Sequence, residues 1–148
     1  MKLLSTVAIL LSASSLSFAA SLSSMSKPEA MDALSDKTIT TISAATLNGQ
    51  VIFDSFTGYF GKDGKMMGGF AKQTKNAPQN DNGTWRIADD GSICMTWTQW
   101  FNGKEECVYF YKLSNALLIV GTKQNFESVI LNSEIQSGNQ IANTVQNP

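Results

Sequence analysis

The side chains that could carry acid and base chemistry in this chain are carboxylates, because the sequence contains no histidine. Histidine is the usual general base of serine and cysteine hydrolases and the commonest metal ligand, so its absence excludes most familiar catalytic sites. A pair of carboxylates, as in glycosidases, is the remaining arrangement for hydrolysis. The candidates are Asp54, Asp63, Asp89, Asp90, Glu105 and Glu106. Most of them fall in expected turns and strand ends, where solvated surface acids are the simpler interpretation.

The two cysteines, Cys94 and Cys107, are the next reactive groups. In an exported chain a pair of cysteines favours a disulfide, because the compartments outside the cytoplasm are oxidising. Two buried thiols are the alternative. With no histidine to complete a ligand set, we expect no zinc or other metal, and no cofactor.

Aromatic residues and the single arginine gather on the central segments of the chain, where they could line an apolar pocket or stack on a ligand. An arginine there could bind a carboxylate ligand, although pairing with a surface acid is the simpler explanation. Ordinary core packing is the alternative for the aromatic residues. The candidate ligand-binding residues are Trp85, Arg86, Trp97, Trp100, Tyr109 and Tyr111.

The N-terminus has the form of a secretory signal peptide over residues 1–19. Lys2 precedes a short apolar run, and Ser17-Phe18-Ala19 offers small side chains at the positions that a signal peptidase reads, which predicts cleavage after Ala19. The run is too short for a membrane span, and no later segment is long enough for one. We therefore expect a periplasmic or secreted protein with a single β-rich domain over residues 20–148.

The mature chain would carry 10 basic and 12 acidic residues, a formal charge of −2. This weak charge argues against nucleic acid as a partner.

The elements expected within the domain are one short helix and a series of strands. Ser26-Lys27-Pro28-Glu29 has the form of a capping box and predicts a helix over about 27–35. From about 38 to 131, short β-rich runs alternate with turn residues, which predicts an antiparallel meander curled into a barrel or half-barrel, with a two-sheet sandwich as the alternative. Residues 132–148 form a polar tail whose end should fray. The expected strands are 38–42, 51–60, 65–71, 84–88, 92–100, 105–113, 116–121 and 126–131, with a long exposed loop over 72–82.

The register of the central strands follows from the turns between them. A three-residue loop with Gly91 in the left-handed position places Trp85 opposite Met95 and Gly83 opposite Trp97. A two-residue turn at Asn102-Gly103 would then separate the cysteines by four residues, too far for a disulfide. A longer loop centred between Trp100 and Phe101 pairs them, and this is the register that we favour.

The segments 83–87 and 90–94, together with Trp97 and Cys107, resemble a family of small exported bacterial proteins known as domain of unknown function 995. The helix followed by residues 34–38, and Tyr59-Phe60 with Asp63-Gly64, are also similar to that family. The resemblance spans roughly residues 28–131; it implies export and a disulfide, and no activity. The strand Gly83-Thr84-Trp85 is also similar to the opening strand of lipocalins, barrels that hold small apolar ligands.

These observations together lead us to expect an exported, non-enzymatic binding module for a small apolar or aromatic ligand. A protein-interaction or inhibitor module is one alternative, and it predicts an exposed aromatic patch. A carboxylate-dependent hydrolase is the other, and it requires two acids that converge in one cleft.

Overall fold

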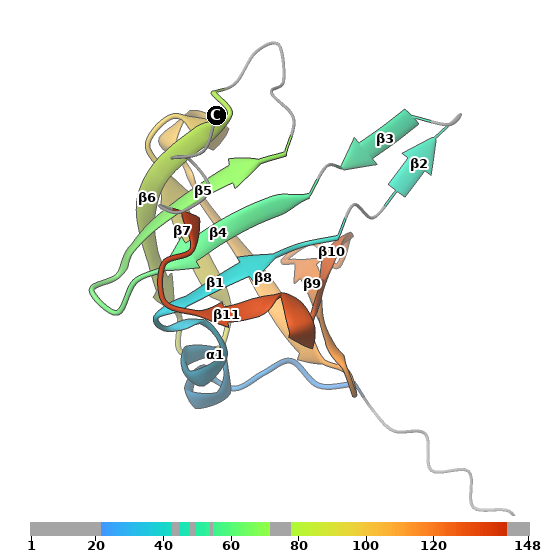
Figure 1. Cartoon of the computed structure of the whole chain (residues 1–148). Coiled ribbons are helices and arrows are strands. Elements are labelled where there is room, and N and C mark those ends of the chain that lie inside the picture. The colour runs from blue at the N-terminus through green and yellow to red at the C-terminus, as the bar shows by residue number, and fades with distance from the viewer. Residues whose placement is uncertain (1–21, 43–44, 48–49, 54, 72–77, 142–148) are drawn as a thin grey trace, which may run out of the picture.

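A computed structural model describes residues 22–42, 45–47, 50–53, 55–71 and 78–141. Its main feature is an antiparallel sheet of nine strands that curls into a nearly closed barrel, with helix α1 (Lys27–Leu34) across one end (Figure 1). The expected barrel and its single short helix are confirmed, and the two-sheet sandwich is not formed. The expected signal peptide lies outside the described residues.

The barrel is a meander in which each strand pairs with its neighbour in the chain from β4 to β10. The other edge of β4 pairs with β1, which pairs in turn with β11. A separate hairpin, β2 and β3, projects from the chain between β1 and β4 (Figure 1). The strands are β1 (Lys37–Thr40), β2 (Ala45–Leu47), β3 (Gln50–Phe53), β4 (Phe56–Phe60), β5 (Lys65–Phe70), β6 (Asn80–Ile87), β7 (Ile93–Trp97), β8 (Glu105–Lys112), β9 (Ala116–Gly121), β10 (Phe126–Leu131) and β11 (Ile135–Ser137).

The barrel closes along the outer edge of β1, which two strands share. β11 pairs with Lys37–Ile39, and beyond Thr40 the N–H of Ile42 donates a hydrogen bond of 2.9 Å to the carbonyl oxygen of Val129 in β10. Strand β11 lies in the segment that the sequence predicts as a polar tail, which is ordered at least through this strand. Closure of the sheet removes most of its exposed edges.

Several strand limits differ from those expected. The predicted run 51–60 is two strands, β3 and β4, and β6 begins at Asn80 because Asn80 pairs with Gly69. The predicted run 92–100 ends as a strand at Trp97, and the 3₁₀ turn η1 (Trp100–Gly103) follows. The expected loop 72–82 thus loses its last residues to β6, and its residues 72–77 lie outside the described part.

Helix α1 begins at the capping box that the sequence predicts. The Glu29 carboxylate accepts hydrogen bonds from the backbone N–H and the hydroxyl of Ser26, at 2.9 and 2.6 Å. Ala30 and Leu34 are fully buried against the end of the barrel, which this helix closes. Apolar burial of this kind supplies most of a short helix's stability.

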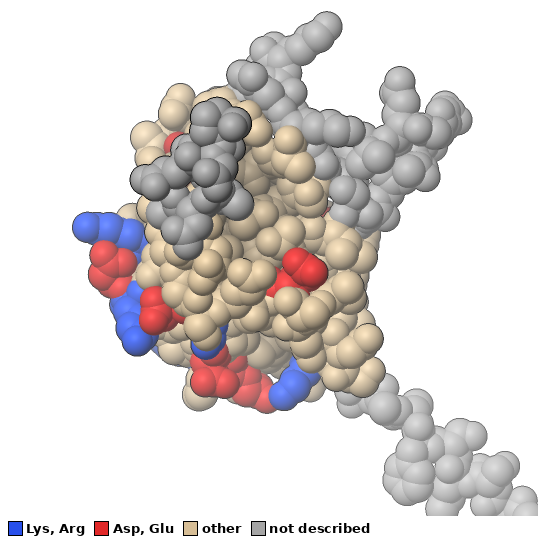
Figure 2. Space-filling view, in the orientation of Figure 1, with Lys and Arg blue, Asp and Glu red and all other residues tan. Residues whose placement is uncertain are grey.

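Charged side chains gather at this closed end. Figure 2 shows them over α1 and the turn between β4 and β5, at the lower left of the view. Three ion pairs lie here, Lys27 with Asp89 at 3.0 Å, Lys62 with Asp36 at 3.4 Å and Lys65 with Asp63 at 3.7 Å. All are exposed and contribute little to stability.

Candidate functional site

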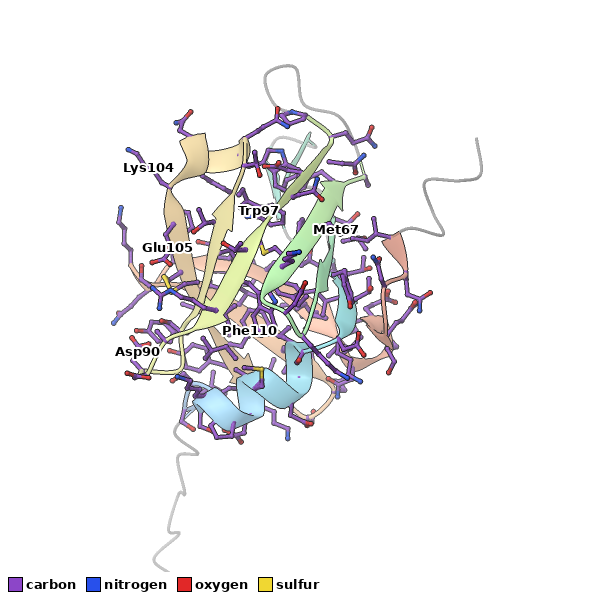
Figure 3. The ribbon with its side chains drawn as sticks, turned by 90° about the vertical axis from the view of Figure 1, so that its left-hand side faces the viewer. Met67, Asp90, Trp97, Lys104, Glu105 and Phe110 are labelled. Carbon is purple, nitrogen blue, oxygen red and sulfur yellow. A yellow bond between two sulfur atoms is a disulfide. The ribbon has the colours of Figure 1, made fainter. Side chains whose placement is uncertain are left out.

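The candidate site is a cavity of about 270 Å³ inside the barrel, at the end opposite α1. Its mouth lies where β4 begins and where β5 and β7 end, and five aromatic side chains surround it: Phe56, Phe70, Trp97, Trp100 and Phe101. Phe60 and Phe110 lie deeper in the barrel. Figure 3 shows Trp97 and Phe110 among the side chains between the strands, whereas Met67 lies on the outer side. The space and its apolar wall are those of a small-molecule site.

Four of these rings form one packed cluster. The Trp97 and Trp100 ring centroids are 4.6 Å apart, and Phe70 lies 5.0 Å from Trp100. Phe56 meets Trp97 edge to face at 5.8 Å. The indole N–H of Trp100 donates a hydrogen bond of 2.8 Å to the carbonyl oxygen of Pro78. With its polar atom satisfied, the Trp100 ring presents an apolar surface to the cavity.

Two facing glycines make room for this cluster. Gly58 of β4 pairs with Gly68 of β5, and a Cβ atom on either would lie 2.5 Å from the Phe56 ring. A Cβ on Gly68 would also lie 2.8 Å from the Trp97 ring. The absence of both side chains therefore lets the Phe56 and Trp97 rings lie close against the sheet.

A buried carboxylate, Asp81, holds the turn that carries Trp100. Asp81 is 4% exposed, and its Oδ2 accepts hydrogen bonds from the backbone N–H groups of Gln99 and Trp100, at 2.8 and 2.9 Å. Its Oδ1 accepts another from the N–H of Asn82. Sequence reasoning missed Asp81, because the loop that it braces is 18 residues away in sequence.

Phe101 sits at the mouth in a strained conformation. Its φ of 54° lies in the left-handed region, where bulky side chains are rarely found, and 55% of its surface is exposed. Backbone strain of this kind is concentrated at binding sites and costs about 1–3 kcal/mol.

We predict that Phe101→Asn maintains the free energy of unfolding or raises it by about 1 kcal/mol, because asparagine tolerates the left-handed conformation. Urea denaturation would measure this. The matched control is Phe126→Asn, which changes an exposed phenylalanine without positive φ. If Phe101→Asn destabilises the protein more than Phe126→Asn does, the wild-type backbone at Phe101 is not strained.

The polar part of the wall comes from Thr41, directly after β1, and from β10. The Thr41 hydroxyl accepts a hydrogen bond of 2.9 Å from the N–H of Phe56, and the Ser128 hydroxyl donates one of 3.1 Å to the Ile42 carbonyl oxygen. The pairing of β10 with β9 shifts register between Phe126 and Ser128, and Glu127 within this bulge lines the cavity. Bulges commonly redirect a side chain in this way.

The structure divides the six predicted ligand-binding residues between the two faces of the sheet. Trp97 and Trp100 line the cavity. Trp85 is also inside the barrel but lies at the closed end, where its indole N–H donates to the Gly61 carbonyl oxygen at 2.9 Å and its ring meets Phe60 at 5.4 Å. The other three, Arg86, Tyr109 and Tyr111, alternate with inward-facing residues and lie on the outer face. Sequence reasoning missed Phe56, Phe70 and Phe101, although Phe56 and Phe70 are aromatic residues in β-rich runs.

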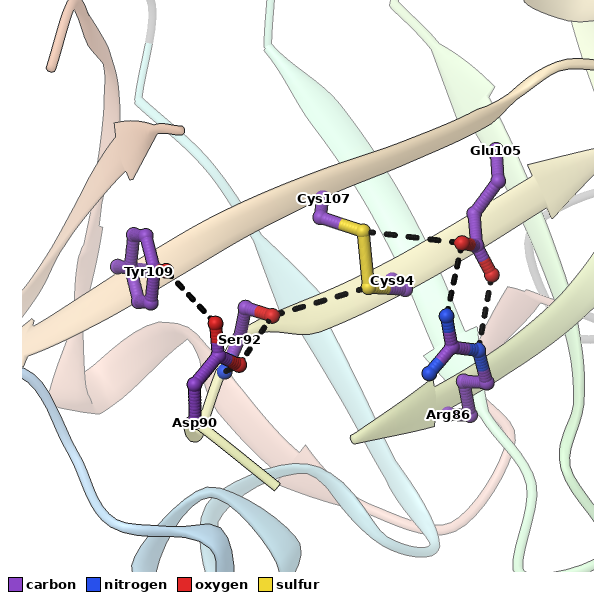
Figure 4. Close-up of a disulfide and its surroundings, with 7 residues drawn as sticks. All are labelled: Arg86, Asp90, Ser92, Cys94, Glu105, Cys107 and Tyr109. Atoms are coloured by element: carbon purple, nitrogen blue, oxygen red, sulfur yellow. Dashed lines mark hydrogen bonds and ion pairs between the residues drawn. A yellow bond between two sulfur atoms is a disulfide. The ribbon is translucent and has the colours of Figure 1, made fainter. Parts of the chain in front are cut away.

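The predicted disulfide between Cys94 and Cys107 is present and joins directly opposite residues of β7 and β8 (Figure 4). Beside it, Arg86 donates two hydrogen bonds of 2.8 Å to the Glu105 carboxylate. This pairing lowers the pKa of Glu105 and raises that of Arg86. Glu105 Oε2 also lies 4.0 Å from Cys107 Sγ, but the bonded sulfurs offer no thiolate to a metal.

Asp90 accepts three hydrogen bonds on the same outer face (Figure 4). The hydroxyl and N–H of Ser92 bind its Oδ1 at 2.7 and 3.0 Å, and the Tyr109 hydroxyl binds its Oδ2 at 2.8 Å. These donors lower the pKa of Asp90 to about 2 and raise that of Tyr109.

A folded-state pKa below the unfolded value means that Asp90 stabilises the fold above pH of about 4, and that this contribution is lost as pH falls toward 2. We predict that Asp90→Asn has a lower melting temperature than the wild type at pH 7 and that the difference shrinks between pH 4 and pH 2. Thermal denaturation across this range measures it. A difference that stays constant down to pH 2 would contradict the assignment.

The acids expected for hydrolysis are scattered. Asp89 and Asp90 lie at one hairpin tip, Glu105 is paired with Arg86, and Glu106 is exposed on β8. Asp54 lies outside the described residues.

Asp36 and Asp63 do line one open depression on the outer face, of about 610 Å³, but each carboxylate is paired with a lysine. Hydrogen bonds from Tyr59 and Lys62 lower the pKa of Asp36, the opposite of what a general acid requires.

Comparison of the chain with family models, with curated proteins and with solved structures finds no match. Within the described ranges, no helix has the length and apolar character needed to cross a membrane. The class of protein is therefore defined by its fold and its site alone. It is an antiparallel β-barrel that is closed by a helix at one end and has an aromatic cavity at the other.

Proposed function

We propose that this protein is an exported, non-enzymatic binding module that holds a small apolar or aromatic ligand inside its barrel. The observation that carries the proposal is the cavity of about 270 Å³ beside the cluster of Trp97, Trp100, Phe56 and Phe70. Apolar surface that is close-packed on one side and open to a cavity on the other gains free energy when a ligand covers it.

Two further features support the proposal. The Asp81 carboxylate accepts hydrogen bonds from the loop that carries Trp100 and so fixes that loop. Phe101 is held at the mouth in a left-handed conformation that stability alone would not select. Export is supported by the form of residues 1–19, by the disulfide and by the resemblance to domain of unknown function 995. Membership of that family is part of this proposal.

The test is a titration with a small aromatic probe, tert-butylbenzene, followed by tryptophan fluorescence. We expect saturable binding by the wild type and at least tenfold weaker binding by Met95→Trp, which adds bulk to the cavity wall. The matched control is Met67→Trp, the same change on the outer side of the barrel, which should bind as the wild type does. Equal binding by both variants, or none by the wild type, would overturn the proposal.

A further inference from the structure

Of the described residues that line the cavity, one is charged, and that residue is an acid. Glu127 lines the cavity together with apolar side chains and the hydroxyls of Thr41 and Ser128. The side chain of Glu127 is exposed, so the carboxylate lies at the mouth and keeps its hydration. Its Oε1 accepts a hydrogen bond of 2.8 Å from the Asn125 side chain, which fixes its direction.

Among the described residues, the Glu127 carboxylate forms no ion pair. The ion pairs among the described residues join Lys27 with Asp89, Lys62 with Asp36, Lys65 with Asp63 and Arg86 with Glu105. None involves Glu127. Lys104, near the η1 turn, points away from the barrel in Figure 3.

A second acid shares this end of the barrel. Glu106 pairs with Met95, which lines the cavity, so Glu106 belongs to the inward-facing register of β8 one step beyond Val108. Its side chain is exposed. Acidic side chains in such positions attract cations and repel anions.

The aromatic cluster also favours a positively charged ligand. The face of each ring carries the negative part of its quadrupole, and tryptophan is the best partner for a cation above its face. Trp97 and Trp100 supply two such rings 4.6 Å apart, with Phe56 and Phe70 beside them.

From these contacts, and on the basis of the proposed function, we infer that the ligand is a small organic cation with an apolar body, such as an aryl or alkyl ammonium compound. Its apolar part lies among the rings, and its ammonium group lies near the Glu127 carboxylate. The cavity volume suits about ten non-hydrogen atoms, fewer than most drug-sized ligands.

The experiment compares two probes of equal shape and different charge, trimethylphenylammonium and tert-butylbenzene. We expect the wild type to bind the cation at least tenfold more tightly in low salt, from cation–π attraction and the nearby carboxylate. Glu127→Gln should reduce this preference severalfold while leaving the affinity for tert-butylbenzene unchanged. The matched control is Asp32→Asn, which removes one negative charge from exposed α1 at the closed end and should keep the preference.

Equal affinity for the two probes would overturn this inference and leave the proposed function standing. A preference that survives in Glu127→Gln would overturn the role of Glu127. If the wild type binds neither probe, the proposed function fails as well.

Discussion

Replacing Trp97 by alanine is expected to lower the free energy of unfolding by about 3 to 5 kcal/mol. Trp97 is 4% exposed, and its ring contacts Trp100 at 4.6 Å and Phe56 at 5.8 Å. Its removal deletes one of the four rings of the cluster and joins the space that it leaves to the existing cavity. The neighbouring glycines Gly58 and Gly68 have no side chains that could fill that space.

Urea denaturation measures this loss, and Thr96→Ala is the matched control on the same strand. Thr96 is half-buried on the outer face, opposite Thr84 and Glu105, and its truncation should cost less than about 1 kcal/mol. Trp97→Ala should also abolish saturable binding of tert-butylbenzene. A loss of stability no larger than that of Thr96→Ala would show that Trp97 is not part of a packed cluster.

Removing the Cys94–Cys107 disulfide has the second largest expected effect, a loss of about 3 kcal/mol. The bond joins residues 13 apart in sequence, and on the chain-entropy model its main effect is to restrict the unfolded chain. Cys94 is 2% exposed, so a small apolar residue suits its buried position. The double variant Cys94→Ala and Cys107→Ala therefore removes the bond and leaves no unpaired thiol.

The same denaturation series with and without reductant checks this prediction. The oxidised wild type should be more stable than the double variant, and the reduced wild type should fall close to it. The double variant itself should not respond to reductant. A wild type that loses no stability after full reduction, with two thiols titrated, would contradict the prediction.

The register of the central strands could be predicted because the turns have strong sequence signals. Gly91 has a φ of 83°, and Trp85 pairs with Met95 as the three-residue loop requires. The pairing of Cys94 with Cys107 required the longer loop, and the structure confirms it. The alternative two-residue turn at Asn102-Gly103 is not formed, because Phe101, Asn102 and Gly103 all adopt positive φ within a wider turn.

The closure of the barrel and the composition of the site were harder to predict. Which strands meet across a barrel depends on its tilt and stagger, which local sequence does not encode. Phe56 and Phe70 reach Trp97 and Trp100 across the interior from other strands, so their convergence has no local signal.

Strand alternation would have separated by face the five candidate residues that lie on strands. It places Trp85 and Trp97 inward, and Arg86 and Tyr109 outward. The aromatic content of a segment identified the region, but the face of each strand decides which of its residues can line the cavity.

Native mass spectrometry of the protein purified without denaturation from the cells that make it, beside the Met95→Trp variant, would detect a ligand held in the cavity. We expect the mass of residues 20–148 less two hydrogens, with an added small-molecule mass that disappears on denaturation and is missing from Met95→Trp. A wild type that carries no added mass, like the variant, would contradict this expectation.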